Sequence, residues 1–233
     1  MKPAILIHTF DGYKWCWPYF YHCFKQHCAP LFQWPIYFCN ETETVTFKGM
    51  KQIKTGHGAW STRLQHALDH IPERDIIYMQ EDFLITHCNI EALVSAYNIH
   101  LSEECNITKL ATNHEFFVRL LGMNVIDGLP LYKQPTKSPY IMSHQPIAIF
   151  QRTWLSSTMS EPMDASQHEL QWSQKINSGE IFCQALCIGR IYRPNKSDII
   201  TIEHAIQKGK VLPLAAQLIK EIDECSKLSL TIQ

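Results

Sequence analysis

The residues whose types could carry chemistry are Gln80-Glu81-Asp82, which directly follow the apolar run at 76–79. That run suits a strand buried on both faces of a sheet. Carboxylates at the end of such a strand are costly to desolvate unless a cation, a hydrogen-bonding ligand or water meets them. Ligands of open α/β sheets bind outside the carboxyl ends of the strands. The pattern predicts an edge that binds a metal ion and a phosphate, with Asp82 at its centre. The alternative is an acidic pair that caps a surface turn.

A second candidate anion site precedes this strand. Apolar residues recur at helical spacing from 60 to 71 and predict an amphipathic helix. Ser61 and Arg63 fall near its amino end, where free backbone N–H groups and an arginine suit a diphosphate. In the alternative reading, Ser61 or Thr62 caps the helix and Arg63 is solvated. The helix followed by the strand at 75–80 forms an αβ unit, which favours a mostly parallel sheet.

The amino-terminal residues read as a strand at 3–8 and a polar, glycine-containing turn at 9–13. Nucleotide-binding α/β domains open in this way. The sequence contains neither the dinucleotide-binding glycine pattern nor the P-loop pattern, so a nucleotide must be held by other means. Tyr13, Trp15 or Trp17 could stack on a base or a sugar, although packing in the core is the commoner role of large aromatic residues.

The remaining elements position these residues. We predict strands at 35–39, 107–111 and 143–152, the last of which enters a helix that carries Trp154 and Leu155. We also predict helices at 18–27, 89–103, 164–177 and 212–225, a hairpin at 181–191, and a polar connection at 201–210. Residues 112–143 are irregular and predict a mixed, partly antiparallel layer that carries acceptor-facing loops. No linker is visible, so we expect one domain with two parts, 1–111 and 112–233.

Composition excludes several classes of protein. The 233 residues include 21 basic and 22 acidic ones, with a net charge of −1, which argues against nucleic acid as a partner. No apolar stretch approaches the roughly 20 residues of a transmembrane helix, and the start does not resemble a signal peptide. The 9 cysteines include no Cys-x-x-Cys pair. We therefore expect reduced thiols and a cytoplasmic protein, with peripheral membrane contact left open.

Three blocks of sequence, taken in order, carry a resemblance to a known group. They are residues 8–13 after the first strand, residues 58–64 ahead of Gln80-Glu81-Asp82-Phe83, and residues 145–150 before a glutamate-bearing helix. From residue 4 to about 210 the chain resembles small GT-A-fold glycosyltransferases that build bacterial or viral surface glycans. The resemblance implies a single α/β, Rossmann-like domain. It also implies a mostly parallel central sheet, helices on both sides and a smaller mixed or antiparallel part.

The same resemblance implies a nucleoside-diphosphate sugar as donor and a glycan or lipid-linked acceptor. In such enzymes an acidic motif holds a divalent metal, and the last acid usually contacts it, which points to Asp82 with Mn²⁺ or Mg²⁺. Gln80 departs from the family's paired aspartates. If Asp82 is not a ligand, Arg63 with Lys208 or Lys210 would counter the leaving-group charge. The residues expected to bind the nucleotide sugar are Thr9, Phe10, Asp11, Trp60, Ser61, Arg63, Glu81 and Lys208, and His204 is a second expected metal ligand.

An inverting transfer needs a carboxylate that takes the proton of the acceptor hydroxyl. The family pattern places a glutamate on the helix at 164–177, so Glu169 is the expected catalytic base, with Glu161 and Asp164 as rivals. Alternatively Glu169 is a charge on the helix surface, and a retaining mechanism stays open. Two other functions remain: a nucleotidyltransferase, or a non-catalytic carbohydrate- or protein-binding module that uses the aromatic segment 13–24.

Overall fold

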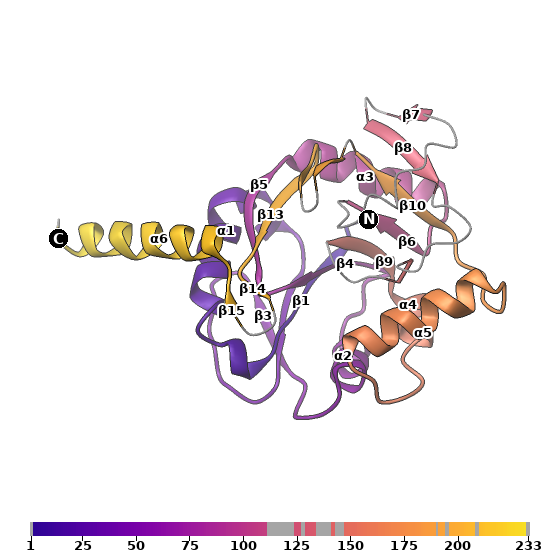
Figure 1. Ribbon diagram of the computed structural model, residues 1–233, viewed down its shortest axis with the longest axis horizontal. Helices are drawn as coiled ribbons and strands as arrows, with labels where there is room; N and C mark the ends of the chain where they lie inside the picture. Colours follow the sequence, from indigo (N-terminus) through magenta and orange to yellow (C-terminus); the bar gives the residue numbers. More distant parts are fainter. Residues whose placement is uncertain are drawn as a thin grey trace.

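The computed structural model describes residues 2–110, 124–126, 129–133, 141–142, 147–189, 191–193, 196–207 and 210–231. Within these residues the largest element is a nine-stranded sheet of order β3-β2-β1-β4-β9-β6-β10-β8-β7 (Figure 1). Its first four strands are parallel: β1 (Ala4–His8), β2 (Ile36–Asn40), β3 (Lys51–Lys54) and β4 (Asp75–Gln80). β1 and β2 are buried along their whole length, as strands covered on both faces must be.

The other half of the sheet is mixed. It contains β6 (Ile107–Lys109), β7 (Asn124–Ile126), β8 (Leu129–Lys133), β9 (Ala148–Gln151) and β10 (Ala185–Ile188). β9 runs antiparallel to both β4 and β6, whereas β6 and β10 are parallel. Only β8 and β9 oppose the direction of the other strands in this described sheet, so the predicted mostly parallel sheet is confirmed.

Helices cover both faces of the sheet. α1 (Trp17–His27) and α3 (Ile90–Ser102) pack on one face, whose core includes Ile7 and Ile77. α2 (Trp60–Asp69), α4 (Arg152–Ser157) and α5 (Ala165–Asn177) cover the other face, on the lower right of Figure 1. Two 3-10 turns, η1 (Asp11–Tyr13) and η2 (Ala29–Gln33), flank α1. The helices at 60–71, 89–103 and 164–177 therefore form close to their predicted limits.

A second sheet begins directly after Asp82. Its order is β11-β12-β13-β5, formed by β5 (Phe83–Cys88), β11 (Ile191–Arg193), β12 (Lys196–Ser197) and β13 (Ile200–His204), all antiparallel. β14 (Ile206–Gln207) pairs with β15 (Lys210–Val211). The predicted polar connection at 201–210 is thus wrong. The predicted hairpin at 181–191 is also wrong, because β10 and β11 join different sheets.

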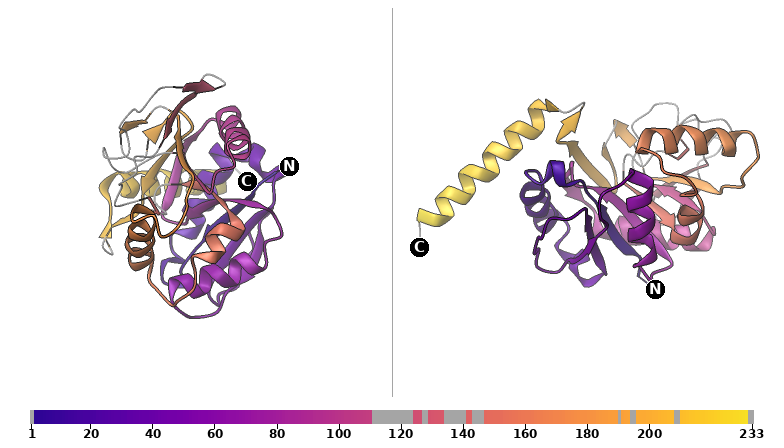
Figure 2. Two further views of the ribbon diagram at one scale, coloured as in Figure 1. Left: turned by 90° about the vertical axis from the view of Figure 1, so that its right-hand side faces the viewer. Right: turned by 90° about the horizontal axis from the view of Figure 1, so that it is seen from below.

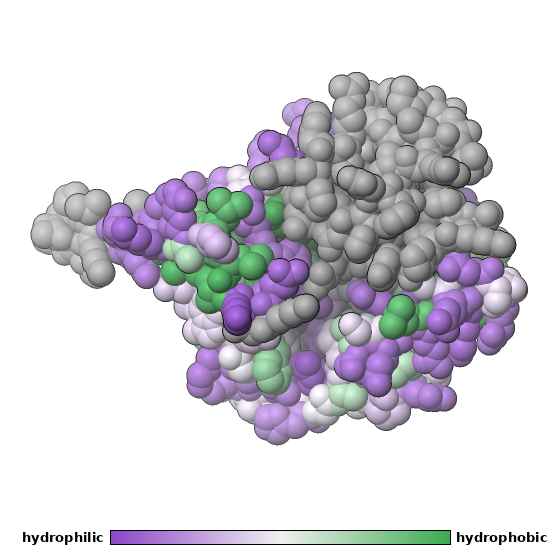
Figure 3. All heavy atoms as spheres, in the orientation of Figure 1, coloured by the Kyte–Doolittle hydropathy of each residue, from purple (hydrophilic) through white to green (hydrophobic). Residues whose placement is uncertain are grey.

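The chain ends in α6 (Pro213–Thr231), which extends beyond its predicted limits and projects from the body (Figures 1 and 2). Its first turns pack on α1, where the Tyr19 hydroxyl donates to Asp223 at 3.1 Å. A hydrophobic patch lies at its base (Figure 3), where Val211 and Leu214 are exposed. Among the described residues, no helix has the length and apolar character needed to cross a membrane.

Candidate functional site

A pocket of about 200 Å³ lies at the carboxyl ends of β1 and β4. These strands pair in parallel with His8 opposite Gln80, so the residues that follow both strands meet at one edge of the sheet. η1 and the first turn of α2 complete the wall. The lining residues are His8, Thr9, Phe10, Tyr13, Trp60, Arg63, Gln80, Glu81 and Asp82. The structure thus brings together Thr9, Phe10, Trp60, Arg63 and Glu81, five of the residues that the sequence marks for nucleotide-sugar binding.

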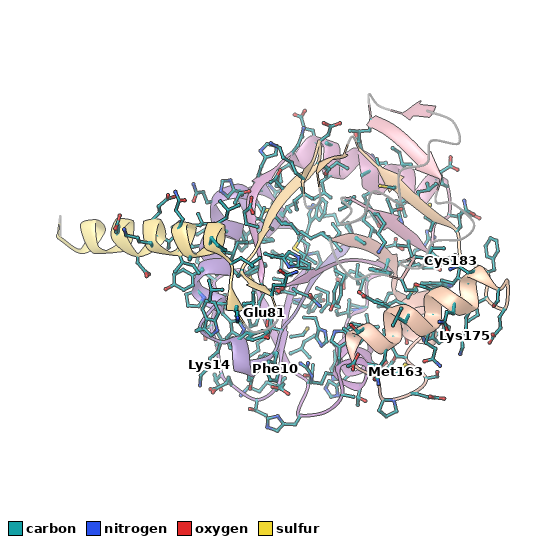
Figure 4. The ribbon with its side chains drawn as sticks, viewed as in Figure 1. Phe10, Lys14, Glu81, Met163, Lys175 and Cys183 are labelled. Carbon is teal, nitrogen blue, oxygen red and sulfur yellow. The ribbon has the colours of Figure 1, made fainter. Side chains whose placement is uncertain are left out.

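Glu81 is a buried carboxyl group in the pocket wall. Its Oε1 accepts a hydrogen bond of 3.1 Å from the backbone N–H of Phe10, beside which it lies in Figure 4. Burial and the neighbouring charge of Asp82 raise the pKa of Glu81 to about 8, although the Phe10 N–H and the Arg63 charge act in the opposite direction. The pocket wall therefore carries a carboxyl group that keeps its proton near neutral pH.

Asp82 lies beside it and is partly buried. Burial raises the pKa of Asp82 to about 7. Its backbone oxygen accepts a 2.7 Å hydrogen bond from Ala205, which ties the turn to the second sheet. A carboxyl group that titrates near neutrality at a pocket edge can bind a cation once its proton leaves.

Arg63 is the cation of the pocket and is only 7% exposed. Its Nη1 donates to the backbone oxygen of Thr9 at 2.7 Å, and its guanidinium lies 5.8 Å from the centre of the Phe10 ring. Its Nε lies 3.9 Å from Glu41 Oε1. Arg63 is therefore held in place and is not solvated, which corrects the alternative reading.

Glu41 is a neighbour of the site that the sequence analysis missed. Glu41 is buried and directly follows β2. Its Oε2 accepts a hydrogen bond of 3.2 Å from the backbone N–H of Asp11, and its Oε1 lies 3.4 Å from Nδ1 of His57. Its position at the carboxyl end of a buried strand was the available signal. Thr9 is a further buried group here, and its Oγ1 has no hydrogen-bond partner within the described part of the chain.

Asp11 and Ser61 do not line the pocket. Asp11 accepts hydrogen bonds from Asn40 Nδ2 and from the backbone of Thr42, at 3.0 and 2.8 Å. Burial alone would raise the pKa of Asp11, but these hydrogen bonds and one from Glu43 hold it well below its usual range. The Ser61 hydroxyl instead donates a hydrogen bond to the backbone oxygen of Glu161 and accepts one from the backbone N–H of Met163. The helix N-cap is Ala59 without a side-chain cap, so the reading in which Ser61 or Thr62 caps α2 is wrong.

Glu169 lies on α5 and is partly buried outside the pocket lining. Its charge acts on two groups of the central sheet, Tyr78 and Lys109. Burial lowers the pKa of Lys109 to about 8, and the charge of Glu169 partly offsets this. Asp164, a rival base, is committed to a capping box at the start of α5.

His204 lies opposite Phe83 in the second sheet, with the two ring centres 4.7 Å apart. Burial lowers the pKa of His204, which favours the neutral imidazole. His204 does not line the pocket, and no three His, Cys, Asp or Glu side chains within the described ranges form a metal-binding group. Lys208 lies outside the described residues.

No protein-family model and no curated protein sequence matches the chain. Solved structures do. A CMP:2-keto-3-deoxy-manno-octonic acid synthetase complexed with CTP matches with a TM-score of 0.53 and 12% identity, over 97% of this chain and 100% of that chain. A UDP-glucose pyrophosphorylase complexed with UDP-glucose matches with a TM-score of 0.53 and 8% identity, over 96% and 100%.

S. aureus TarS 1-349 in complex with UDP matches with a TM-score of 0.51 and 14% identity, over 87% of this chain and 59% of that chain. A longer TarS chain is covered over only 36% of its length. At these identities the likeness shows the fold alone, which is GT-A-like. Three of the matching structures were solved with CTP, UDP-glucose or UDP bound.

Proposed function

We propose that the protein is a glycosyltransferase that binds a nucleoside-diphosphate sugar in the pocket and passes the sugar to a glycan or lipid-linked acceptor. One observation carries the proposal: a single pocket combines a buried arginine, two adjacent carboxyl groups and aromatic side chains at the carboxyl edge of a GT-A-like sheet. Such edges are where ligands of open α/β sheets bind.

Each wall of the pocket suits one part of such a ligand. Phe10 and Tyr13 offer apolar faces to a base, and their ring centres lie 5.6 Å apart. The planar guanidinium of Arg63 suits the oxygens of a diphosphate. The buried Oγ1 of Thr9 would gain a partner from a polar ligand group.

The donor set of the pocket also fits Mn²⁺ or Mg²⁺. Asp82 supplies a hard oxygen ligand once its proton leaves, and Mg²⁺ is commonly held by one or two carboxylates plus substrate phosphates. The ion would stabilise the charge of the departing nucleoside diphosphate. In this proposal Asp82 holds the ion, Arg63 binds the diphosphate, and Glu169 takes the proton of the acceptor hydroxyl. His204 and Lys208 remain proposed contacts only.

The proposal is tested by thermal shift with UDP-, GDP-, CMP- and dTDP-sugars, each with and without Mn²⁺. We expect one nucleotide to stabilise the protein, and to do so only with metal. Asp82→Asn should abolish the metal-dependent shift, whereas Asp69→Asn, an exposed change on α2, should retain it. A panel without any response would overturn the proposal, and an unchanged shift in the Asp82 variant would reject Asp82 as the ligand.

The catalytic step has its own test. Glu169→Gln should retain donor binding and lose sugar transfer, because the amide cannot accept the hydroxyl proton. Glu161→Gln, an exposed change in the segment before α5, is the matched control and should transfer normally. Retained turnover in the Glu169 variant would exclude Glu169 as the base.

A nucleotidyltransferase is the second candidate, because two structural neighbours that are covered over their full length are a nucleotide-sugar synthetase and a pyrophosphorylase. The products separate the two activities. A nucleotidyltransferase would release pyrophosphate from a nucleoside triphosphate and a sugar phosphate, whereas a glycosyltransferase releases the nucleoside diphosphate. Binding of glycans without nucleotide or metal would instead favour a binding module.

A further inference from the structure

The carboxylate of Asp11, in η1, is saturated by hydrogen bonds from the end of β2 and the residues that follow it. Its Oδ1 accepts from Asn40 Nδ2 and from the Glu41 N–H, at 3.0 and 3.1 Å. Its Oδ2 accepts from the Thr42 N–H, the Thr42 hydroxyl and the Glu43 N–H, at 2.8, 2.9 and 3.0 Å. A carboxylate has about four lone-pair sites, so these five hydrogen bonds leave no acceptor for a ligand.

Glu41 returns one of these hydrogen bonds. Its Oε2 accepts from the Asp11 N–H at 3.2 Å, so each of the two carboxylates accepts from the backbone of the other residue. This reciprocal pair, the Asp11–Glu41 clasp, joins the turn after β1 to the turn after β2. The two strands are parallel neighbours, so both turns lie at the edge of the sheet where the pocket opens.

The clasp sets Glu41 next to Arg63. Each of the two side chains is 8% exposed, and Glu41 Oε1 lies 3.9 Å from Arg63 Nε. Nε has no hydrogen-bond partner within the described ranges, so Glu41 acts on it as a nearby charge that little water screens. Arg63 in turn donates to the Thr9 oxygen and lies 5.8 Å from the centre of the Phe10 ring. A displaced Glu41 would therefore release one side of the guanidinium group.

Neither Asp11 nor Glu41 lines the pocket, whereas Arg63 does. We propose that Asp11 is a positioning residue for nucleotide-sugar binding: through the clasp it holds Glu41, and thereby Arg63, where Arg63 meets the diphosphate. Asp11 itself does not touch the nucleotide, in contrast to the expectation from the sequence. The ligand part rests on the proposed function. The clasp does not, because it consists of the protein's own hydrogen bonds.

Amide hydrogen exchange of the ¹⁵N-labelled full chain tests the clasp without a ligand. We expect the N–H groups of Thr42 and Glu43 to exchange slowly, because the Asp11 carboxylate holds both. Asp11→Asn should accelerate both about tenfold, since the amide keeps a single acceptor oxygen. Exchange of these two groups in the wild type as fast as in an unprotected amide would overturn the proposal, even if the variant does not fold.

The same measurement with UDP and Mn²⁺ separates positioning from contact. The N–H groups of Thr42 and Glu43 should exchange as slowly in the complex as in the free protein, because Asp11 keeps its hydrogen bonds. A direct contact between Asp11 and the nucleotide would take an acceptor from these groups. Their exchange would then accelerate in the complex, and this result would overturn the proposal.

The ligand part uses UDP-glucose with Mn²⁺ as the probe, measured by calorimetry. Asp11→Asn should weaken binding about tenfold. Thr42→Val, which removes one hydrogen bond of the carboxylate and keeps its charge, should weaken binding about threefold. In an Arg63→Lys background, Asp11→Asn should weaken binding by less than about threefold, because the residue through which Asp11 acts is already changed. An undiminished tenfold loss in that background would overturn the proposal.

Glu43→Gln is the matched control. Glu43 gives its backbone N–H to Asp11, but its side chain only pairs with the exposed Lys14, at 2.6 Å. This variant should bind UDP-glucose within about twofold of the wild type. A tenfold loss in Glu43→Gln would mean that the charge of the segment matters and the clasp does not. If the wild type binds no nucleotide sugar of the panel, the proposed function fails, while the exchange experiment still decides whether the clasp exists.

Discussion

Ser61 and Met163 are joined by two hydrogen bonds that run in opposite directions. The Ser61 N–H donates to the Met163 oxygen at 3.1 Å, and the Met163 N–H donates to Ser61 Oγ at 2.8 Å. The Ser61 hydroxyl in turn donates to the Glu161 oxygen at 2.8 Å. Met163 lies at the amino end of α5 in Figure 4, so the first turn of α2 fixes the start of the helix that carries Glu169.

Ser61→Ala should lower the free energy of unfolding by about 1–3 kcal/mol, because it leaves the buried Met163 N–H without its acceptor. Sugar transfer should fall more than nucleotide binding, since α5 loses its anchor. Urea denaturation measures the first effect. Ser157→Ala is the control: its hydroxyl is exposed and bonds the Trp154 oxygen, so its cost should stay within about 0.5 kcal/mol. Equal losses in the two variants would contradict the anchoring role.

Stability should fall as the pH rises from about 4.5 to about 8. The pKa of Glu81 increases from 4.5 to about 8 on folding, through burial and then the charge of Asp82. The folded state therefore holds the Glu81 proton more tightly than the unfolded state does. This contribution to the stability of the fold is fully present below pH 4.5 and is lost as the pH rises through about 8. Glu81→Gln should reduce the slope and be more stable than the wild type at high pH. Urea denaturation between pH 4.5 and 8 measures this pH dependence of the unfolding free energy. Glu180→Gln, a change at an exposed residue, is the control and should keep the slope of the wild type. A wild type whose stability increases over this range would refute the assignment.

Binding of Mn²⁺ with a nucleotide should strengthen as the pH rises through about 7. Burial raises the pKa of Asp82 to about 7, and a metal ligand must be deprotonated, so binding releases a proton. Calorimetry in two buffers of different ionisation enthalpy measures this release. In Asp82→Asn the residual binding should lose this pH dependence, and an identical profile in both proteins would exclude Asp82.

Asp75→Asn should lower the free energy of unfolding by about 1–3 kcal/mol, because it weakens the buried hydrogen bond that the carboxylate accepts from the Tyr97 hydroxyl. Asp75 Oδ1 lies 3.4 Å from His100 Nε2, and Oδ2 accepts from the Tyr97 hydroxyl at 3.1 Å. Arg74 is the control: its side chain is 45% exposed, so its 3.8 Å contact with Asp75 should contribute less than about 1 kcal/mol. Urea denaturation of the Asp75→Asn and Arg74→Gln variants measures the two losses of unfolding free energy. Equal losses in the two variants would contradict this prediction.

The sequence was informative wherever local periodicity decides the structure. The apolar face at 60–71 and the buried run at 76–79 predicted α2 and β4, and their order predicted the sheet edge at Asp82. The sequence does not reveal long-range pairing. Residues 200–204 do alternate between apolar and polar side chains, but the run is short, and its partner β5 lies far away along the chain.

The site was predicted unevenly for the same reason. Asp11 and Ser61 are polar residues next to strand and helix ends, a position that suits either a ligand or a structural hydrogen bond. Their partners, at 40–43 and 161–163, depend on the folded arrangement. Tyr78 gave no polar signal, because its hydroxyl lies within an apolar strand and becomes a centre of hydrogen bonding only when His8 and Gln80 come into register.

The chain passes from the nine-stranded sheet to the four-stranded sheet at Glu81 and Asp82, and the Ala205 N–H clamps this crossing at 2.7 Å. The backbone at Glu81 and Asp82 therefore links the positions of the two sheets. A substitution in β13 that shifts the four-stranded sheet would therefore also move the backbone of Asp82, to which Ala205 is hydrogen-bonded. The orientation of the Asp82 carboxyl group could thus change while the strand pairing within each sheet stays the same.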